Sequence, residues 1–333
     1  MPEIDYVNGG SYFSPRRLGH VNLWVNDLGK SEKFYSDTSG LCVEFTEPGL
    51  IASFLGTGHT PHDLGLMEVT RGKDRYGRDG VLQLPGTAGL APGLNHLAWE
   101  LENERALVIA FRKLKEGGVP TDLTVDHQVA HSVYIFDPDG NYNEFYCDTI
   151  RDWRKVLGGP MDLLTVHWDP MATDGSDEPL YETEPKVRTN AAAPIVPWRI
   201  THAVLMTADI TGLRDFYTRV TGLAVVNEIE AHGRQIVYLR AGLFEVSHHL
   251  VLIQADKASY GRACFELRSE EAFADARTKL IAMGARIVAD LDLPWKGSFF
   301  LADPDGMLSE YYVRRGGMAD IANVPFDQLE LAA

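Results

Sequence analysis

Three residues of this 333-residue chain have the types and the positions to bind a metal ion together. His20 and His96 each open the first strand of a repeated sequence unit, and Glu144 lies on a later strand of the second unit. A single histidine on a strand is more often a packed core residue, but three such residues at matching places favour a shared site. If the two units face each other, two neutral imidazoles and one carboxylate form one face of a metal site. That set suits non-haem Fe(II), with positions left open for a substrate and for oxygen.

The elements that must position these residues come from a duplication. The stretch LGHVNLWVNDLGKSEKFYSDTSGL around His20 is repeated as ITHAVLMTADITGLRDFYTRVTGL around His202. The Asp-Pro-Asp-Gly stretch that precedes Glu144 is repeated before Glu310. The chain therefore consists of two homologous halves, residues 17–150 and 199–315.

Each half is itself doubled, with hydrophobic alternation typical of strands around one short helix in every unit. The first unit predicts a strand, a helix and three strands, and the same order recurs from His96. The Asp-Pro-Asp-Gly tetrapeptide is typical of the turn that joins the last two strands. The sequence thus predicts an α+β fold of four βαβββ units. In the first half we expect strands at 20–25, 43–45, 51–55, 64–69, 96–101, 132–136 and 143–147, and helices at 31–35 and 104–116.

Composition limits the classes of partner. The chain has 31 Lys and Arg against 47 Asp and Glu, a formal net charge of −16, which disfavours nucleic acid or an anionic membrane surface. Only 3 cysteines occur and none forms a Cys-x-x-Cys pair, which fits a reducing, cytoplasmic setting. The first residues resemble neither a signal nor a transit peptide, and no apolar run is long enough to span a membrane.

Three segments lie outside the repeats. Residues 1–16 form an N-terminal extension and residues 316–333 a C-terminal tail. Residues 151–198 are acidic and rich in proline, so we expect a solvated linker between the halves. The alternative is that this linker covers a pocket or makes an oligomer contact.

The sequence resembles a known family, the type I extradiol ring-cleavage dioxygenases of the vicinal oxygen chelate superfamily. The family signature begins with a small or aliphatic residue, any residue and His, here Val125-Asp126-His127. After five residues it continues as Val-Tyr-Ile-Phe-Asp-Pro-Asp-Gly from Val133 to Gly140, and it ends at Glu144. The match is complete, whereas Asp-Pro-Asp-Gly alone recurs across the whole superfamily. The four-unit layout extends the resemblance over most of the chain and implies two vicinal-oxygen-chelate domains.

The resemblance implies roles for particular residues. His20, His96 and Glu144 fall at the family's three iron-ligand positions, in residues 17–150. The implied cofactor is Fe(II), and Mn(II) accepts the same ligands.

Further roles follow from the same resemblance. Tyr134 falls at the tyrosine that accompanies the metal ligands, and His127 at the histidine of the signature, with His131 as a competitor. His62 falls in the segment that holds the family's acid–base histidine, with His59 as the weaker candidate. A histidine near its ordinary pKa of about 6.5 can take a proton from a catechol and pass it on.

The second half keeps only part of this set. His202, His248 and Glu310 remain, but Arg262 takes the position of the second histidine ligand, and a guanidinium would repel a dication. Phe300 replaces the tyrosine. We therefore expect the metal site of residues 199–315 to be lost, although the family's usual two-domain members keep iron in the C-terminal half.

The leading functional hypothesis is a dioxygenase that opens a catecholic ring next to its vicinal diol with O₂, as a catechol 2,3-type enzyme of aromatic catabolism. An alternative is a metal-dependent isomerase or lyase resembling glyoxalase I, with Glu68 as a fourth ligand, because Glu68 follows His20 at the spacing of Glu144 from His96. A third is a binding module like the superfamily's antibiotic-sequestering proteins. We also expect a homo-oligomer, because the units expose strand edges. Aromatic residues that could line the pocket are Phe13, Trp24, Trp99 and Tyr142, but we expect most of them to pack in the core.

Overall fold

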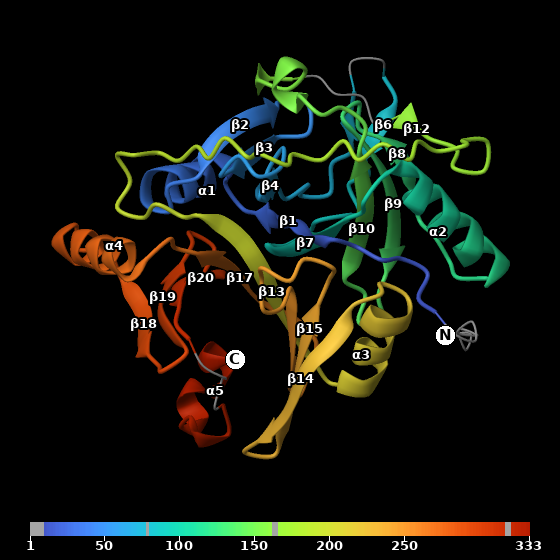
Figure 1. Ribbon diagram of the computed structural model, residues 1–333. Coiled ribbons are helices and arrows are strands. Elements are labelled where there is room, and N and C mark those ends of the chain that lie inside the picture. Colours follow the sequence, from blue (N-terminus) through green and yellow to red (C-terminus); the bar gives the residue numbers. More distant parts are fainter. Residues whose placement is uncertain (1–9, 78–79, 162–165, 317–320) are drawn as a thin grey trace.

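Two large mixed sheets lie side by side, one from each half of the chain, in the computed structural model (Figure 1). The structure describes residues 10–77, 80–161, 166–316 and 321–333. Parts of the predicted extension, linker and tail, namely 1–9, 162–165 and 317–320, lie outside these ranges. The predicted α+β fold with four βαβββ units is confirmed. Among the described residues, no helix is long and apolar enough to cross a membrane.

The first half forms a sheet in the order β11-β2-β3-β4-β1-β7-β10-β9-β8-β12, whose edge strands β11 (Gly159–Pro160) and β12 (Val166–His167) come from the segment that follows it. Its elements are β1 (Arg17–Val25), α1 (Leu28–Lys33), the π-helical turn η1 (Phe34–Thr38), β2 (Cys42–Glu47), β3 (Ala52–Gly56), β4 (Leu64–Glu68), β7 (Gly93–Glu100), α2 (Glu104–Glu116), β8 (Thr124–Asp126), β9 (Ala130–Phe136) and β10 (Tyr142–Asp148). The glycine-rich insertion between β4 and β7 forms a small separate hairpin, β5 (Arg75–Tyr76) and β6 (Leu82–Leu84).

The second half repeats this plan in the order β14-β15-β16-β13-β17-β20-β19-β18. Its elements are β13 (Arg199–Thr207), α3 (Ile210–Arg219), β14 (Ala224–Ala231), β15 (Arg234–Arg240), β16 (Leu250–Gln254), β17 (Ser259–Glu266), α4 (Glu270–Ala282), β18 (Ile287–Asp292), β19 (Lys296–Ala302) and β20 (Leu308–Arg314). The tail adds the short helices η3 (Ile321–Asn323), η4 (Phe326–Gln328) and α5 (Leu329–Ala332). Figure 1 shows α5 in the hollow of this curved sheet.

Local capping explains where the helices begin. The side chain of Asp27 accepts a hydrogen bond from the amide of Lys30 at α1, and Asn103 accepts one from Ala106 at α2. Each side chain satisfies an amide that the first helical turn leaves free. Gly117 and Gly118 follow α2, and Gly118 has a φ of 67°, which ends the helix at the predicted place.

The two halves share one hydrophobic core and a reciprocal pair of hydrogen bonds. The hydroxyl of Tyr35 donates to Asp303 of the second half (3.2 Å), and the hydroxyl of Tyr217 donates to Asp137 of the first half (3.0 Å). Each bond therefore joins the helical segment of one half to the Asp-Pro-Asp-Gly turn of the other. One continuous cluster of buried apolar side chains includes strands and helices from both halves.

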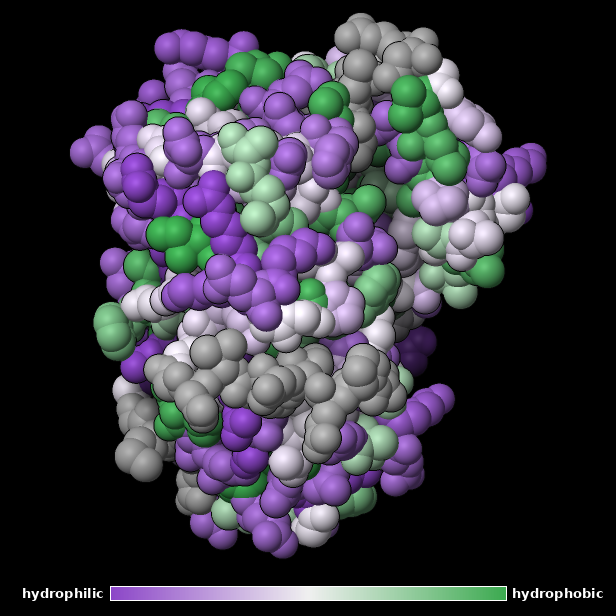
Figure 2. Space-filling view, turned by 90° about the vertical axis from the view of Figure 1, so that its right-hand side faces the viewer, coloured by the Kyte–Doolittle hydropathy of each residue, from purple (hydrophilic) through white to green (hydrophobic). Residues whose placement is uncertain are grey.

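The segment 151–198 differs from a solvated connector. Residues 159–160 (β11, Gly159–Pro160) and 166–167 (β12, Val166–His167) add strands to opposite edges of the first sheet. Trp153 and Leu157 are buried against Phe45 and Phe54 of β2 and β3. On the molecular face in Figure 2, hydrophilic side chains predominate and hydrophobic ones are scattered. The packing of Leu157 fits the alternative expectation for this segment, namely that it covers a pocket.

Candidate metal centre

Strand pairing brings His20, His96 and Glu144 to one point. β1 and β7 are antiparallel, with Asn22 opposite His96 and His20 opposite Ala98, so the two histidines are symmetric about the centre of the pairing. β10 runs parallel to β7 and places Glu144 next to Ala98. His20 Nε2 lies 3.3 Å from His96 Nε2 and 3.0 Å from Glu144 Oε2, and His96 Nε2 lies 3.1 Å from the same oxygen.

This triangle has the size of one face of a metal's coordination shell. Ligand atoms about 2.1 Å from a shared cation, at neighbouring octahedral positions, are about 3 Å apart. The Nδ1 atom of His96 lies 2.9 Å from Asn95 Oδ1, an acceptor, so Nδ1 carries the proton and the lone pair of Nε2 points to the centre. The residues present therefore fit a divalent ion with two imidazoles and one carboxylate.

The surroundings keep these groups in the protonation states that ligation requires. Burial lowers the pKa of His20, so its ring is neutral at pH 7. Burial opposes ionisation of Glu144, but the ring nitrogens of His20 and His96 beside its Oε2 hold the pKa of this carboxyl well below the ordinary range. The Ser132 hydroxyl donates to Glu144 Oε1 (2.6 Å) and so orients Oε2 toward the histidines.

The residue before His20 has to be glycine because the side chain of Tyr146 packs against it. A Cβ at this position would lie 2.0 Å from the hydroxyl oxygen of Tyr146 on β10. The ring of Tyr146 in turn lies 5.4 Å from that of His20. Glycine at 19 thus permits the close packing that holds His20.

His62 stands beside the triangle. Its ring centroid is 3.9 Å from that of His20 and 4.8 Å from that of Phe54, and neither ring nitrogen has a hydrogen-bond partner among the described residues. The loop that carries it is fixed by Asp63, which accepts a hydrogen bond from the Thr57 hydroxyl (2.8 Å). Burial lowers the pKa of His62 well below 6.5, so the ring is neutral at pH 7.

Tyr134 and His127 form a pair on the other side of the triangle. The Tyr134 hydroxyl lies 3.0 Å from His127 Nε2, and that nitrogen is 3.9 Å from Glu144 Oε1. The Tyr134 ring meets the His96 ring edge to face, with centroids 5.8 Å apart. Burial lowers the pKa of His127, which leaves it a neutral hydrogen-bond partner for the phenol.

The competing histidines lie elsewhere. His131 is on β9 with its side chain opposite to that of Tyr134, where its Nδ1 is 2.7 Å from Glu104 of α2 and its ring stacks on Trp168. An odd spacing along a strand reverses the face, so this outcome is readable from sequence. His59 contacts Thr57 (3.0 Å) and the ring of Trp198, outside the cavity.

Glu68 does not reach the triangle, and its proposed role as a fourth ligand is wrong. Its carboxylate accepts the amide of Leu28 at the start of α1 (3.1 Å) and pairs with Arg71 (3.2 Å). Glu144 on β10 pairs with Ala98 on β7. At the corresponding place in the first unit, Gly65 on β4 pairs with Asn22 on β1. A Cβ there would lie 1.9 Å from Asn22 Oδ1, so the Asn22 side chain fills that place.

The triangle opens into a cavity of about 140 Å³. Phe13, Trp24, Trp99 and Tyr142 do not line it, which agrees with the expected core packing of most of them. Phe13 stacks on Phe145 in the core, and Trp99 is buried against Tyr217. The lining residues that sequence reasoning missed are Asn22, Phe45, Glu47, Leu50, Phe54, Thr60, Pro61, Met67, Val129, Ala130, Tyr146, Asp148 and Leu157. For Asn22 and Tyr146 a signal existed, because each lies two positions from a predicted ligand on the same strand face.

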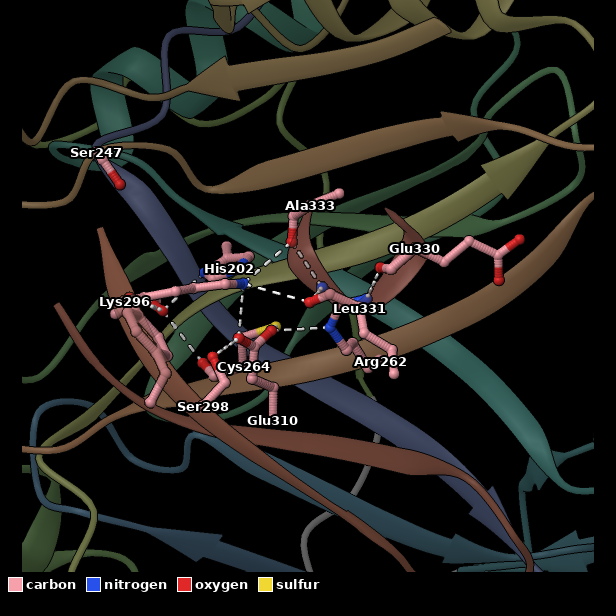
Figure 3. Close-up of polar contacts among 12 residues, drawn as sticks. His202, Ser247, Arg262, Cys264, Lys296, Ser298, Glu310, Glu330, Leu331 and Ala333 are labelled. Atoms are coloured by element: carbon pink, nitrogen blue, oxygen red, sulfur yellow. Dashed lines mark hydrogen bonds and ion pairs between the residues drawn. The ribbon is translucent and has the colours of Figure 1, made fainter. Parts of the chain in front are cut away.

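The corresponding point of the second half carries its own cations (Figure 3). Arg262 pairs with Val204 as His96 pairs with Asn22, which confirms the predicted alignment. Its Nε donates to Glu310 Oε2 (2.9 Å), and Lys296 Nζ lies 2.7 Å from Glu310 Oε1. Both carboxylate oxygens are therefore already paired.

His202, Cys264 and Glu310 are nevertheless within ligand distance of one another. Burial and the Glu310 charge raise the pKa of the Cys264 thiol well above its ordinary value, so it does not offer a thiolate. Arg262 also donates to the main-chain oxygens of Glu330 (2.7 Å) and Ala333 (2.7 Å), which closes the cluster from the tail side. The guanidinium and ammonium groups thus stand where a metal would.

Comparisons with known proteins agree with this fold. The sequence profile of the Glyoxalase/Bleomycin resistance protein/Dioxygenase superfamily matches residues 17–145 and 199–311, and the chain belongs to this superfamily. A catechol-2,3-dioxygenase of Bacillus subtilis (strain 168) is 30% identical over 161 residues, which are 48% of this chain and 52% of that protein. Biphenyl-2,3-diol 1,2-dioxygenase 3 of Rhodococcus globerulus is 29% identical over 132 residues, 40% of this chain and 63% of that protein.

These matches span between about half and two thirds of the length of the curated relatives. A solved structure of BphC, a halotolerant catechol dioxygenase, superposes with a TM-score of 0.64 at 13% identity. That comparison covers 93% of this chain and 90% of the other, and it shows a common fold.

The ion pairs of the second half predict a stability effect. Glu310→Gln leaves Arg262 and Lys296 buried without a countercharge, and should lower the free energy of unfolding by about 3–5 kcal/mol at pH 7. Burial opposes ionisation of Glu310, but the two cations lower its pKa to about 2. The stabilisation is therefore full above the ordinary carboxyl pKa of 4.5 and is lost as the pH falls toward about 2.

Urea unfolding of the wild-type protein and of the Glu310→Gln variant at pH 7 and pH 3 measures this effect. Glu270→Gln removes an exposed pair with Arg315 and should cost at most about 1 kcal/mol. A Glu310 variant no less stable than this control would contradict the account.

Proposed function

We propose that this protein is an Fe(II)-dependent extradiol dioxygenase, which cleaves a catecholic ring next to its vicinal diol with O₂. The observation that carries the proposal is the triangle of His20, His96 and Glu144, open to a buried cavity and flanked by unligated histidines and a tyrosine. The similarity to catechol and biphenyl-diol dioxygenases supports it. We place the metal in residues 17–150; Mn(II), which takes the same ligands, is the second choice of ion.

The proposed ligands would hold the ion by two neutral nitrogens and one charged oxygen. The bound ion would supply net positive charge, which lowers the pKa of catechol hydroxyls, and coordination positions for the diol and O₂. The chain's own contribution starts with orientation. Ser132 fixes the Glu144 carboxylate and Asn95 fixes the His96 ring, so neither has to reorganise when the ligands engage.

His62 is the residue we assign to proton transfer. Its neutral ring faces the cavity next to His20 with both nitrogens unpaired among the described residues, so the nitrogen that carries no hydrogen can accept a proton from a catechol hydroxyl and return it later. We assign Tyr134 and His127 to the opposite side, where their shared hydrogen bond can position a diol oxygen and hold a proton. The apolar walls at Phe45 and Phe54 keep water from competing for these contacts.

Turnover tests the proposal directly. Protein purified without oxygen and loaded with Fe(II) should consume one O₂ per catechol and form a yellow ring-fission product, whose mass equals that of the catechol plus two oxygen atoms. The measurement combines an oxygen electrode with absorbance and mass spectrometry over a panel of substituted catechols. Oxygen uptake with an ortho-quinone as product, or no uptake with any catechol, would overturn the proposal.

Metal content tests the ligand set. We predict one metal per chain, loss of metal and activity in His96→Ala, and near wild-type metal in His202→Ala, because Arg262 and Lys296 already neutralise the second cluster. Elemental analysis after dialysis against a trace of chelator makes the comparison. Two metals per chain, or loss of metal from the His202 variant, would contradict the assignment.

His62→Phe separates proton transfer from packing. If His62 moves the proton, metal stays bound and the catechol still binds, but kcat falls by about 10²–10⁴. His59→Phe is the matched control, because His59 lies outside the cavity and should change kcat by at most a few-fold. A few-fold effect at both positions would mean that His62 only packs, and loss of metal would make it a ligand.

A further inference from the structure

A segment outside the repeats closes one side of the cavity. We call residues 151–161 the strap; it runs from β10 to the edge strand β11. Just before the strap, the amide of Thr149 donates to the main-chain oxygen of Val129 between β8 and β9 (2.8 Å). At its end, β11 pairs in parallel with β2, and the amide of Met161 donates to the main-chain oxygen of Thr46 (2.7 Å). The strap therefore joins the β8 side of the first sheet to its β2 side.

The middle of the strap supplies a wall of the cavity. The side chain of Leu157 lines the cavity together with Phe45, Phe54 and Val129. Leu157 is 4% exposed, and it belongs to one apolar cluster with these three residues and with Trp153. The strap carries no ligand candidate of the triangle. The size of the Leu157 side chain can therefore change the cavity while the strand pairings that bring the ligand candidates together stay as they are.

Contacts within the strap and to β2 fix the position of Leu157. The side chain of Trp153 is buried, and its main-chain oxygen accepts hydrogen bonds from the amides of Val156 (2.9 Å) and Leu157 (2.8 Å). The guanidinium of Arg154 lies over the Trp153 ring, 4.0 Å from its centroid, and 3.6 Å from the buried carboxylate of Glu44 on β2. These contacts tie the turn before Leu157 to the sheet, so a ligand can displace the leucine only by breaking apolar packing.

The cavity that is bounded in this way is small. Its volume is about 140 Å³, whereas pockets that take drug-sized ligands have about 300–1,000 Å³. Its apolar walls are formed by Phe45, Leu50, Phe54, Met67, Val129 and Leu157. Side chains packed at the density of a protein interior leave few voids into which a larger ligand could extend.

We propose that Leu157 is a specificity-determining residue, which limits the substrates to single-ring catechols with short apolar substituents. The proposal rests on the proposed ring-cleavage function and names its substrate class. With the diol at the triangle, a methyl substituent would fit between the apolar walls, whereas a second aromatic ring would have to displace the Leu157 side chain. Leu157→Ala replaces an isobutyl group by a methyl group and should enlarge the cavity on the side of the strap.

Two pairs of catechols test the size limit: 3-methylcatechol with 3-phenylcatechol, and 4-methylcatechol with 4-phenylcatechol. Dissociation constants are measured without oxygen on Fe(II)-loaded protein, and kcat/KM is then measured with oxygen. Each methylcatechol should bind at least about tenfold more tightly than its phenyl counterpart, because a packed apolar site accepts extra volume only at a cost. Equal or tighter binding of either phenylcatechol, or no binding of any of the four compounds, would overturn the proposal.

Variants then assign the size limit to this side chain. Leu157→Ala should narrow the binding ratio of each pair by at least about fivefold, and Leu157→Val by a smaller factor, while metal content stays at the wild-type level. Leu291→Ala is the matched control, because Leu291 is also buried (5% exposed) but belongs to a separate apolar cluster of the second half, outside the cavity. An unchanged ratio in both Leu157 variants, or an equal change in the Leu291 variant, would refute the role of Leu157. If the ratio responds to Leu157 but no catechol is cleaved, the size limit stands and the ring-cleavage function fails.

Discussion

The antiparallel pairing of β1 with β7 is the constraint on which the rest of the site depends. Hydrogen bonds fix the register of two strands, and with a side-chain period of two a slip by one residue would turn His20 and His96 to the opposite face. In the observed register the two histidines lie diagonally across a shared centre, at Val21 and Leu97. β10 then has only to pair with β7 for a carboxylate to complete the triangle. The pairing of β1 with β7 and the pairing of β7 with β10 are therefore sufficient to bring the three side chains together.

The second half shows what the same register does when the residues around the glutamate change. Glu310 is as deeply buried as Glu144, and a buried carboxylate requires a cation whatever its source. In the first half the neighbours of Glu144 Oε2 are two imidazole nitrogens, and we propose that a bound ion supplies the charge. In the second half Arg262 and Lys296 supply it through ion pairs, and main-chain oxygens of the tail accept further hydrogen bonds from both. The second half thus has fixed side-chain charge at the position that corresponds to the triangle.

The sequence predicts the repeated fold and the convergence of the three ligand candidates because both follow from periodicity within strands. The position of His131 also follows from strand parity, since it lies three positions before Tyr134 and an odd offset reverses the face. Residues such as Phe45 and Phe54 could not be assigned to the cavity, because the register of β2 and β3 depends on a bulge and a turn that hydrophobic alternation does not encode. Glu68 was misplaced for a related reason. Counting residues from His20 assumes that the connections between strands have equal length in both units, and they do not.

The reciprocal bonds from Tyr35 to Asp303 and from Tyr217 to Asp137 make the two halves depend on each other. Each half holds the turn before the other half's buried glutamate, and the core is continuous across the boundary. Deleting the second half would remove the Tyr217 hydroxyl from Asp137 and expose apolar surface of the first half. The contacts that keep the first half in shape therefore also constrain the fold of the second. Side chains around Glu310 can differ from those around Glu144 only as long as these contacts remain.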